Sequence, residues 1–169
     1  LLACDLTPKT MYQLSTSLEQ SLGLGFEASG LTRVSLNGSG DLLYVVSDDP
    51  RPEHLLLIQP DGHQQYVRLP FSIDAESISF NPLDSTLLIL DEGSFANNRP
   101  ARLLTLALDH QGQVILDGGV ARVLRIQEIP FGLPLSSNGY EAIVLDTVAS
   151  KLYVGEQDSG RIQVFSYQN

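Results

Sequence analysis

The sequence has little positive charge. Lys9 and Lys151 are its two lysines, and the 20 acidic residues outnumber the 10 basic ones, which gives a net charge of −10 at neutral pH. Proteins that hold nucleic acid, anionic membranes or polyphosphates on a basic patch need the opposite balance, so the composition argues against these partners. An acidic surface still accepts an anion when a divalent cation bridges the two.

Long apolar runs are also lacking, because no stretch approaches the length of a membrane-spanning helix. The length of 169 residues and the ordinary mix of residue types are those of a single globular domain with a core.

Cysteine occurs once, as Cys4 in the tetrapeptide Leu-Leu-Ala-Cys. Small residues before a cysteine are typical of the end of a bacterial lipoprotein signal, where the cysteine is lipidated. The alternative is an ordinary cysteine in a first strand. We expect residues 1–4 to be the remnant of such a signal. A lipid on Cys4 would place the protein in the bacterial cell envelope, periplasmic or at the surface, with that anchor as its membrane contact.

Residues 5–25 are expected to form a polar tether and a lead-in segment. Within this range, residues 11–22 fit both a helical face and the alternation of a strand, and we favour the extended form.

From residue 26 onward, short runs rich in Leu, Val, Ile and Tyr alternate with clusters of Gly, Pro, Asn and Asp. This pattern is typical of antiparallel strands joined by tight turns. It predicts an all-β domain over residues 26–169, with strands at 29–36, 41–48, 54–60, 65–71, 76–82, 85–92, 102–109, 122–129, 140–146, 151–157 and 162–168.

These strands repeat one unit: a glutamate, an apolar strand, a turn, a second apolar strand that ends in acidic residues, and a third strand. The units begin at Glu27, Glu76 and Glu141. Such spacing is typical of β-propeller blades. We therefore predict a β-propeller, present as an open arc of about three blades.

The repeated glutamates predict an ion site. The first two strands of a blade are antiparallel, so the start of the first lies beside the end of the second. Glu27, Glu76 and Glu141 are therefore expected to gather at the mouth of the central channel. A supporting acidic rim surrounds them, formed by Asp48, Asp74, Asp91, Glu92 and Glu156.

Crowded carboxylates repel one another, and a bound cation would remove that penalty. Ca²⁺ fits best because the candidate ligands are hard oxygen atoms. The alternative is that each glutamate caps a loop by accepting backbone N–H bonds.

Other chemistry has little support. His54, His63 and His110 fall in separate turns, which argues against a transition-metal site. There is no Gly-x-Ser-x-Gly motif, and Ser29 is expected within a strand rather than a strained turn. Residues 36–41 lack the lysine of a phosphate loop and are predicted to form a hairpin turn.

Three pairs of stretches carry a family resemblance: EASGLTRV with LYVVSDD, IDAESISFNP with LLILDEG, and SNGYEAIVLD with KLYVGEQ. They resemble the six-bladed β-propellers of the SdiA-regulated family and of the related "esterase-like activity of phytase" family. The resemblance covers residues 26 to about 166. It implies an exported propeller with calcium near its axis and, for the second family, a phosphoester or ester hydrolase activity.

The chain departs from these families in two ways. They usually have Glu-Gly where this chain has Glu76-Ser77 and Glu141-Ala142, although a small residue is kept. The chain is also shorter than the roughly 4 to 8 blades that close a propeller. We therefore expect the remainder of a longer chain to complete it.

Two functions are consistent with the sequence. The first is a non-enzymatic, calcium-stabilised propeller that binds a small-molecule or protein ligand on its top face, where the glutamates gather. The second is a calcium-dependent esterase or phosphatase, in which the metal polarises a phosphate or a water. Arg99 and Arg102 could contact an anion beside the rim. The scarcity of other basic residues favours the first function, since phosphate-handling enzymes usually supply Arg or Lys clamps.

Overall fold

The computed structural model describes residues 26–36, 40–48, 53–93, 99–129, 139–157 and 160–168. Within these ranges the regular structure is β throughout, without a helix, and neighbouring strands are antiparallel. The prediction of an all-β fold is confirmed. Cys4 and the lead-in segment 11–22 lie outside the described residues.

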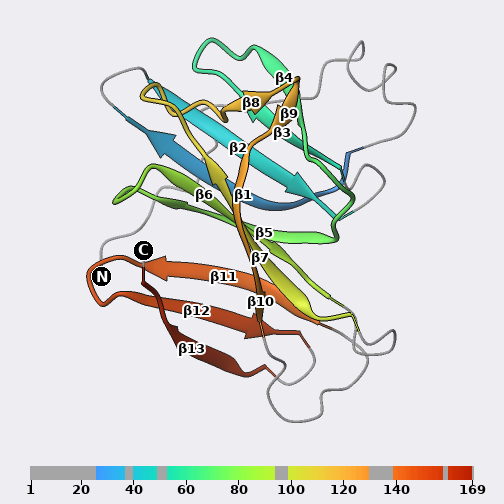
Figure 1. Ribbon diagram of the computed structural model, residues 1–169, viewed down its shortest axis with the longest axis vertical. Helices are drawn as coiled ribbons and strands as arrows, with labels where there is room; N and C mark the ends of the chain where they lie inside the picture. Colours follow the sequence, from blue (N-terminus) through green and yellow to red (C-terminus); the bar gives the residue numbers. More distant parts are fainter. Residues whose placement is uncertain are drawn as a thin grey trace, which may run out of the picture.

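The strands form three sheets and one short hairpin (Figure 1). Sheet 1 contains, in spatial order, β1 (Ala28–Ser35), β2 (Asp41–Ser47), β3 (His54–Ile58) and β4 (Gln64–Arg68). Sheet 2 contains β5 (Ala75–Asn81), β6 (Thr86–Asp91), β7 (Ala101–Ala107) and β10 (Val123–Ile129). Sheet 3 contains β11 (Tyr140–Asp146), β12 (Lys151–Glu156) and β13 (Ile162–Ser166). The hairpin of β8 (Leu116–Asp117) and β9 (Val120–Ala121) lies between β7 and β10 in the chain.

The first hairpins of sheets 2 and 3 use the same turn. The side chain of the last strand residue, Asn81 or Asp146, accepts a hydrogen bond from the backbone N–H two residues later, at 3.1 Å and 3.0 Å. The chain then passes through a left-handed conformation at Ser85 (φ 55°) and Ser150 (φ 53°). Positive φ is uncommon outside glycine. Its recurrence at matching positions supports the prediction that these sheets repeat one unit.

The three sheets stack face to face, with their first strands side by side. The strand β5 packs against β1 on one side and against β11 on the other (Figure 1). Between sheets 1 and 2 the core includes Tyr44 and Leu87, and between sheets 2 and 3 it includes Leu88 and Leu152. Burying each large apolar side chain contributes roughly 1.5–3 kcal/mol, so these two layers hold the stack together.

The strand β6 is apolar from Leu87 to Leu90 because both of its faces are buried. Successive side chains of a strand point to opposite faces. Leu87 and Ile89 enter the core shared with sheet 1, whereas Leu88 and Leu90 enter the core shared with sheet 3. All four are fully buried because sheet 2 is covered on both faces.

The first strands approach one another closely because their residues are small. A Cβ added to Gly30 of β1 would lie 2.8 Å from the Cα atom of Ser77 on β5. On the other side of β5, the Ser77 hydroxyl accepts a hydrogen bond of 3.1 Å from the backbone N–H of Ile143 on β11. One small residue in β5 therefore brings all three first strands together.

The buried hydroxyl of Tyr44 ties sheet 1 to the chain between β7 and β8. It donates to the carbonyl oxygen of Gly112 at 2.9 Å and accepts from the backbone N–H of Val114 at 3.1 Å. Burial, as the main cause, raises the pKa of this phenol, so the hydroxyl stays neutral. Val114 is itself part of the core between sheets 1 and 2.

Candidate metal centre

Each first strand contains a β-bulge at the same place, next to the end of the second strand. In β5, Ala75 pairs with Asp91 and Ser77 pairs with Leu90, which leaves Glu76 as the extra residue. In β11 the same pattern leaves Glu141 as the extra residue, and in β1 it leaves Ser29. Bulges of this kind re-aim a side chain at the edge of a ladder.

This register corrects the repeat alignment made from the sequence. Ser29, and not Glu27, occupies the position of Glu76 and Glu141. The Ser29 hydroxyl donates to the carbonyl oxygen of Ala75, so at this position sheet 1 has a link between first strands instead of a carboxylate. Glu27 is exposed and lies two residues earlier, at the position of Asp74. Aligning the three units by sequence missed this two-residue offset, because Glu27 lies near the start of the first unit much as Glu76 and Glu141 do in theirs.

Three carboxylates converge beside the bulge of β5. One oxygen atom each from Asp74, Glu76 and Glu92 lies within 4.8 Å of the other two. All three side chains are half-buried. Asp74 precedes β5, Glu76 is its bulged residue, and Glu92 follows β6, so antiparallel pairing of β5 with β6 brings them together. The backbone N–H of Glu92 donates to the carbonyl oxygen of Asp74 at 2.9 Å and fixes this arrangement.

Further acids act on Glu76 from both neighbouring sheets. Burial, followed by the charges of Glu141, Glu92, Asp48 and Asp74, raises the pKa of Glu76 from 4.5 to about 8. Burial and the charge of Glu92 also raise the pKa of Asp74, against the opposing effect of Arg99. The predicted gathering of acids is therefore strongest around Glu76.

Asp48 follows β2 and contributes from sheet 1. Its Oδ1 atom is buried and has no hydrogen-bond partner among the described residues. A buried carboxylate oxygen without a partner is costly unless a proton, a water or a cation satisfies it. A cavity of about 310 Å³ opens beside it, lined by Asp48, Ser72, Ile73, Asp74 and Arg99.

Asp91 is part of the acidic rim in sequence but has a different partner in the fold. It is fully buried and forms ion pairs with Arg99 at 2.7 Å and with Arg102 at 2.5 Å. It also accepts a hydrogen bond of 3.2 Å from the backbone N–H of Asp74. Its charge is thereby balanced by protein groups. Arg99 and Arg102, which the sequence suggested as contacts for an anion, pair with this buried carboxylate instead.

The remaining rim residues have partners of their own. Oε1 of Glu92 accepts a hydrogen bond of 2.9 Å from the backbone N–H of Gly139, and so connects the trio to the start of β11. Glu156 is buried, and its Oε1 accepts a bond of 2.5 Å from the side-chain amide of Gln163. The hydrogen bond from Gly139 uses only Oε1 of Glu92, so its second carboxylate oxygen remains a candidate ligand.

The arrangement as a whole can hold a hard cation. Three carboxylates supply oxygen atoms at a spacing that one ion can bridge, and Asp48 and Glu141 add negative charge nearby. Arg99 is the only basic side chain that lines the adjacent cavity in the described part of the chain, and it contacts Asp74 at 3.4 Å and Asp91.

No family model matches the sequence, and no curated protein matches it. In the described residues no helix is long and apolar enough to cross a membrane.

Proposed function

We propose that this chain is part of a β-propeller that binds a divalent cation at the inner ends of its blades. Three antiparallel sheets with their first strands side by side, and the same bulge in each first strand, support the blade assignment. The recurrent turn of sheets 2 and 3 supports it independently.

The observation that carries the cation proposal is the carboxylate trio of Asp74, Glu76 and Glu92. Without a cation, burial and mutual repulsion favour the protonated form of Glu76 at neutral pH, as its pKa of about 8 indicates. Ca²⁺ is the ion we propose, because its sites consist of carboxylate, carbonyl and water oxygens in flexible geometry. Water would complete its coordination.

Thermal unfolding of this chain in Ca²⁺ and in EDTA tests the proposal. A ligand that binds only the folded state at about 100 times its Kd adds about 2.7 kcal/mol of stability. For a chain of this size that corresponds to a rise in Tm of roughly 5–10 °C. Glu76→Gln should abolish most of the rise, whereas Glu128→Gln, an exposed glutamate on β10, should leave it intact. Identical melting curves of the wild-type chain in Ca²⁺ and EDTA would mean that the trio is structural.

A calcium-dependent phosphatase or esterase is the second candidate. The cavity beside Asp74 and Arg99 would place a phosphate within reach of both a cation and a guanidinium group. Against it, Arg99 already pairs with Asp91 at 2.7 Å. Turnover of p-nitrophenyl phosphate that disappears in EDTA and in Glu76→Gln would favour the enzyme. Calcium binding without turnover would favour a binding domain, whose small-molecule or protein ligand sits on the face that carries the carboxylates.

We also propose that the protein acts in the bacterial cell envelope, on the basis of the Leu-Leu-Ala-Cys tetrapeptide at residues 1–4. Mass spectrometry of the protein from its native host would detect a lipid on Cys4, and an unmodified cysteine would contradict this part of the proposal.

A further inference from the structure

The junction between sheets 2 and 3 is joined by hydrogen bonds at its first strands. The backbone N–H of Gly139, which directly precedes β11, donates to Oε1 of Glu92 at 2.9 Å. The backbone N–H of Ile143 donates to the Ser77 hydroxyl at 3.1 Å. The first of these bonds ends on a member of the carboxylate trio, so the start of sheet 3 is in direct contact with the candidate metal centre.

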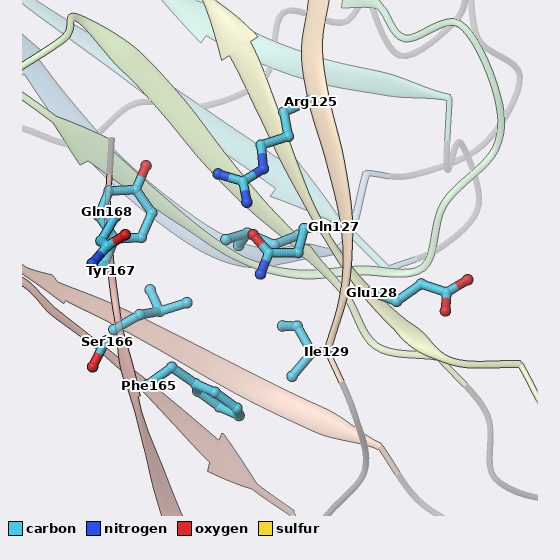
Figure 2. A pocket seen from close by; sticks show the side chains of 10 residues that line it. Arg125, Gln127, Glu128, Ile129, Phe165, Ser166, Tyr167 and Gln168 are labelled. Carbon is cyan, nitrogen blue, oxygen red and sulfur yellow. The ribbon is translucent and has the colours of Figure 1, made fainter.

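The outer end of the same junction is hollowed. A cleft of about 390 Å³ lies there between β10 and β13 (Figure 2). Leu103, Leu152 and Phe165 line it from the core shared by the two sheets, and Figure 2 shows Arg125 and Gln127 reaching into the space. Sheets 2 and 3 therefore approach each other closely at their first strands and less closely at their outer strands.

Gly139 occupies a position that carries an acid in the other two sheets. In sheet 2 the backbone N–H of Glu92 donates to the carbonyl oxygen of Asp74, and in sheet 3 that of Gln157 donates to Gly139 at 3.4 Å. Gly139 therefore corresponds to Asp74, and each lies two residues before the bulged glutamate of its sheet. Glu27 holds the same position in sheet 1. Sheet 3 presents bare backbone where the other sheets carry a carboxylate.

The missing side chain makes room for Glu92. A Cβ added to Gly139 would overlap Cγ of Glu92 and would lie 2.5 Å from its carbonyl oxygen. Contacts this short with backbone atoms force the chain to move. Glu92 cannot move alone, because its own backbone N–H is bonded to Asp74 at 2.9 Å. A side chain at position 139 would therefore disturb two members of the trio.

An oxygen atom beside the trio points to a ligand at this centre. Oδ1 of Asp48 is buried and has no hydrogen-bond partner among the described residues. Asp48 corresponds to Glu92, since each directly follows the second strand of its sheet. The N–H group that would match Gly139 is that of Asp74, and it donates to Asp91 instead, at 3.2 Å. The acid at the junction of sheets 1 and 2 therefore still needs a cation, a proton or a water.

We infer that Gly139 is a positioning residue of the proposed cation site, through which sheet 3 controls the affinity of that site. The inference rests on the proposed function. The N–H group of Gly139 holds Oε1 of Glu92 and leaves the other carboxylate oxygen for the ion. Partners that hold a metal ligand in this way are worth roughly 10- to 100-fold in metal affinity. Because coupling is reciprocal, a bound cation also stabilises the contact of sheet 3 with sheet 2.

Isothermal titration calorimetry of the whole chain with Ca²⁺ tests the inference. Gly139→Ala should bind Ca²⁺ at least about tenfold more weakly than the wild type. Gly155→Ala is the matched control in the same sheet and should bind as the wild type does, because its added Cβ makes only ordinary contacts with Ala142. Equal affinities of Gly139→Ala and the wild type would overturn the inference and leave the proposed cation site standing. A wild-type chain that binds no Ca²⁺ would overturn both.

A second substitution separates positioning from a general loosening of sheet 3. Glu92→Gln keeps the shape of the side chain and removes its charge. If Gly139 acts through Glu92, Gly139→Ala should weaken Ca²⁺ binding by a smaller factor in the Glu92→Gln chain than in the wild type. Equal factors in the two backgrounds would mean that Gly139→Ala acts on the fold and not on Glu92, and would overturn the inference.

Amide hydrogen exchange of the wild-type chain gives a measurement that needs no variant. In Ca²⁺ at about 100 times its Kd, the amide of Gly139 should exchange at least about tenfold more slowly than in EDTA, because the cation holds Glu92 in place. The amide of Gly62, which donates to Gln59 at the same distance of 2.9 Å between β3 and β4, should exchange equally fast in both. An unchanged rate at Gly139 in a chain that binds Ca²⁺, or equal slowing of the two amides, would overturn the inference.

Discussion

Glu76 differs from the other carboxylates because it is the bulged residue of β5. The bulge of β5 inserts this residue between two paired positions, so it points toward neighbours from sheets 1 and 3. Those neighbours, Asp48 and Glu141, carry the same charge. Desolvation and charge repulsion both raise the pKa of Glu76. The folded state is therefore most stable when this side chain holds a proton or contacts a cation.

The stability of the cation-free protein should therefore depend on pH through Glu76. Its pKa is 4.5 in an unfolded chain and about 8 in the fold, so between these values the folded state holds a proton that the unfolded state has lost. The free energy of unfolding then falls as the pH rises through this window. Asp74, whose pKa is also raised, adds to the fall. The measurement is Tm in EDTA at several pH values from about 5 to 8.5.

Glu76→Gln should flatten this dependence, and Glu128→Gln should not. Because Ca²⁺ competes with the proton, its affinity for the wild-type chain should increase with pH over the same window. A pH profile that Glu76→Gln leaves unchanged would assign the titration to another group.

The sequence placed acids at the strand ends that meet, but it misplaced Glu27 and did not indicate what each acid does. Asp91 and Glu92 are adjacent at the end of one strand, and alternation turns them to opposite sides. Asp91 is buried against Arg99 and Arg102, whereas Glu92 reaches the carboxylate trio. The arginines lie beyond β6 in the chain, and no local pattern links them to Asp91. Only the packed fold distinguishes a charge-balanced acid from a candidate ligand.

At the scale of strands, the sequence predicted nearly all of the described ladder. The strands of sheets 1, 2 and 3 have five residues or more of apolar or alternating sequence, and turn residues mark their ends. The hairpin of β8 and β9 was missed. Its strands have two residues each around Gly118 and Gly119, which is too short for a periodic signal to develop. The bulges were missed for a related reason. One inserted residue shifts the alternation of side chains between the two faces of a strand but leaves the composition of the strand unchanged.

The close approach of the first strands gives a test at this scale. Gly30→Ala would place a Cβ 2.8 Å from the backbone of Ser77, so β1 and β5 would have to separate. Overpacking of this kind costs about 1–3 kcal/mol. In Gly155→Ala the added Cβ would meet only Ala142, with its Cβ at 3.5 Å and its carbonyl oxygen at 4.0 Å, and both are ordinary contacts. Chemical denaturation should show the loss in Gly30→Ala and little change in Gly155→Ala. Equal stabilities would contradict the tight packing of β1 on β5.

At the scale of the whole molecule, contacts distant in sequence join the sheets. Tyr44 in sheet 1 bonds to Gly112 and Val114, which follow β7. Tyr44→Phe keeps the ring but leaves a buried carbonyl oxygen and a buried N–H group without their partner. The expected cost is about 1–3 kcal/mol.

For a chain of this length such a loss lowers Tm by roughly 2–4 °C for each kcal/mol. Tyr153→Phe, at a half-buried tyrosine of sheet 3, is the control and should change Tm little. A Tm of Tyr44→Phe equal to that of the wild type would mean that the buried hydroxyl contributes no stability.

The packing of the chain after β7 against sheet 1 determines when sheet 1 can become stable during synthesis. The core of sheet 1 includes Val114 and Ala121, which the ribosome adds long after β4 ends at Arg68. At about 5–20 residues per second, that interval lasts roughly 3–10 s. Until these residues are added, the part of the sheet 1 core that they cover is exposed to chaperones and proteases. Nascent chains arrested before Ala121 emerges should be degraded readily, and those arrested after it should begin to resist.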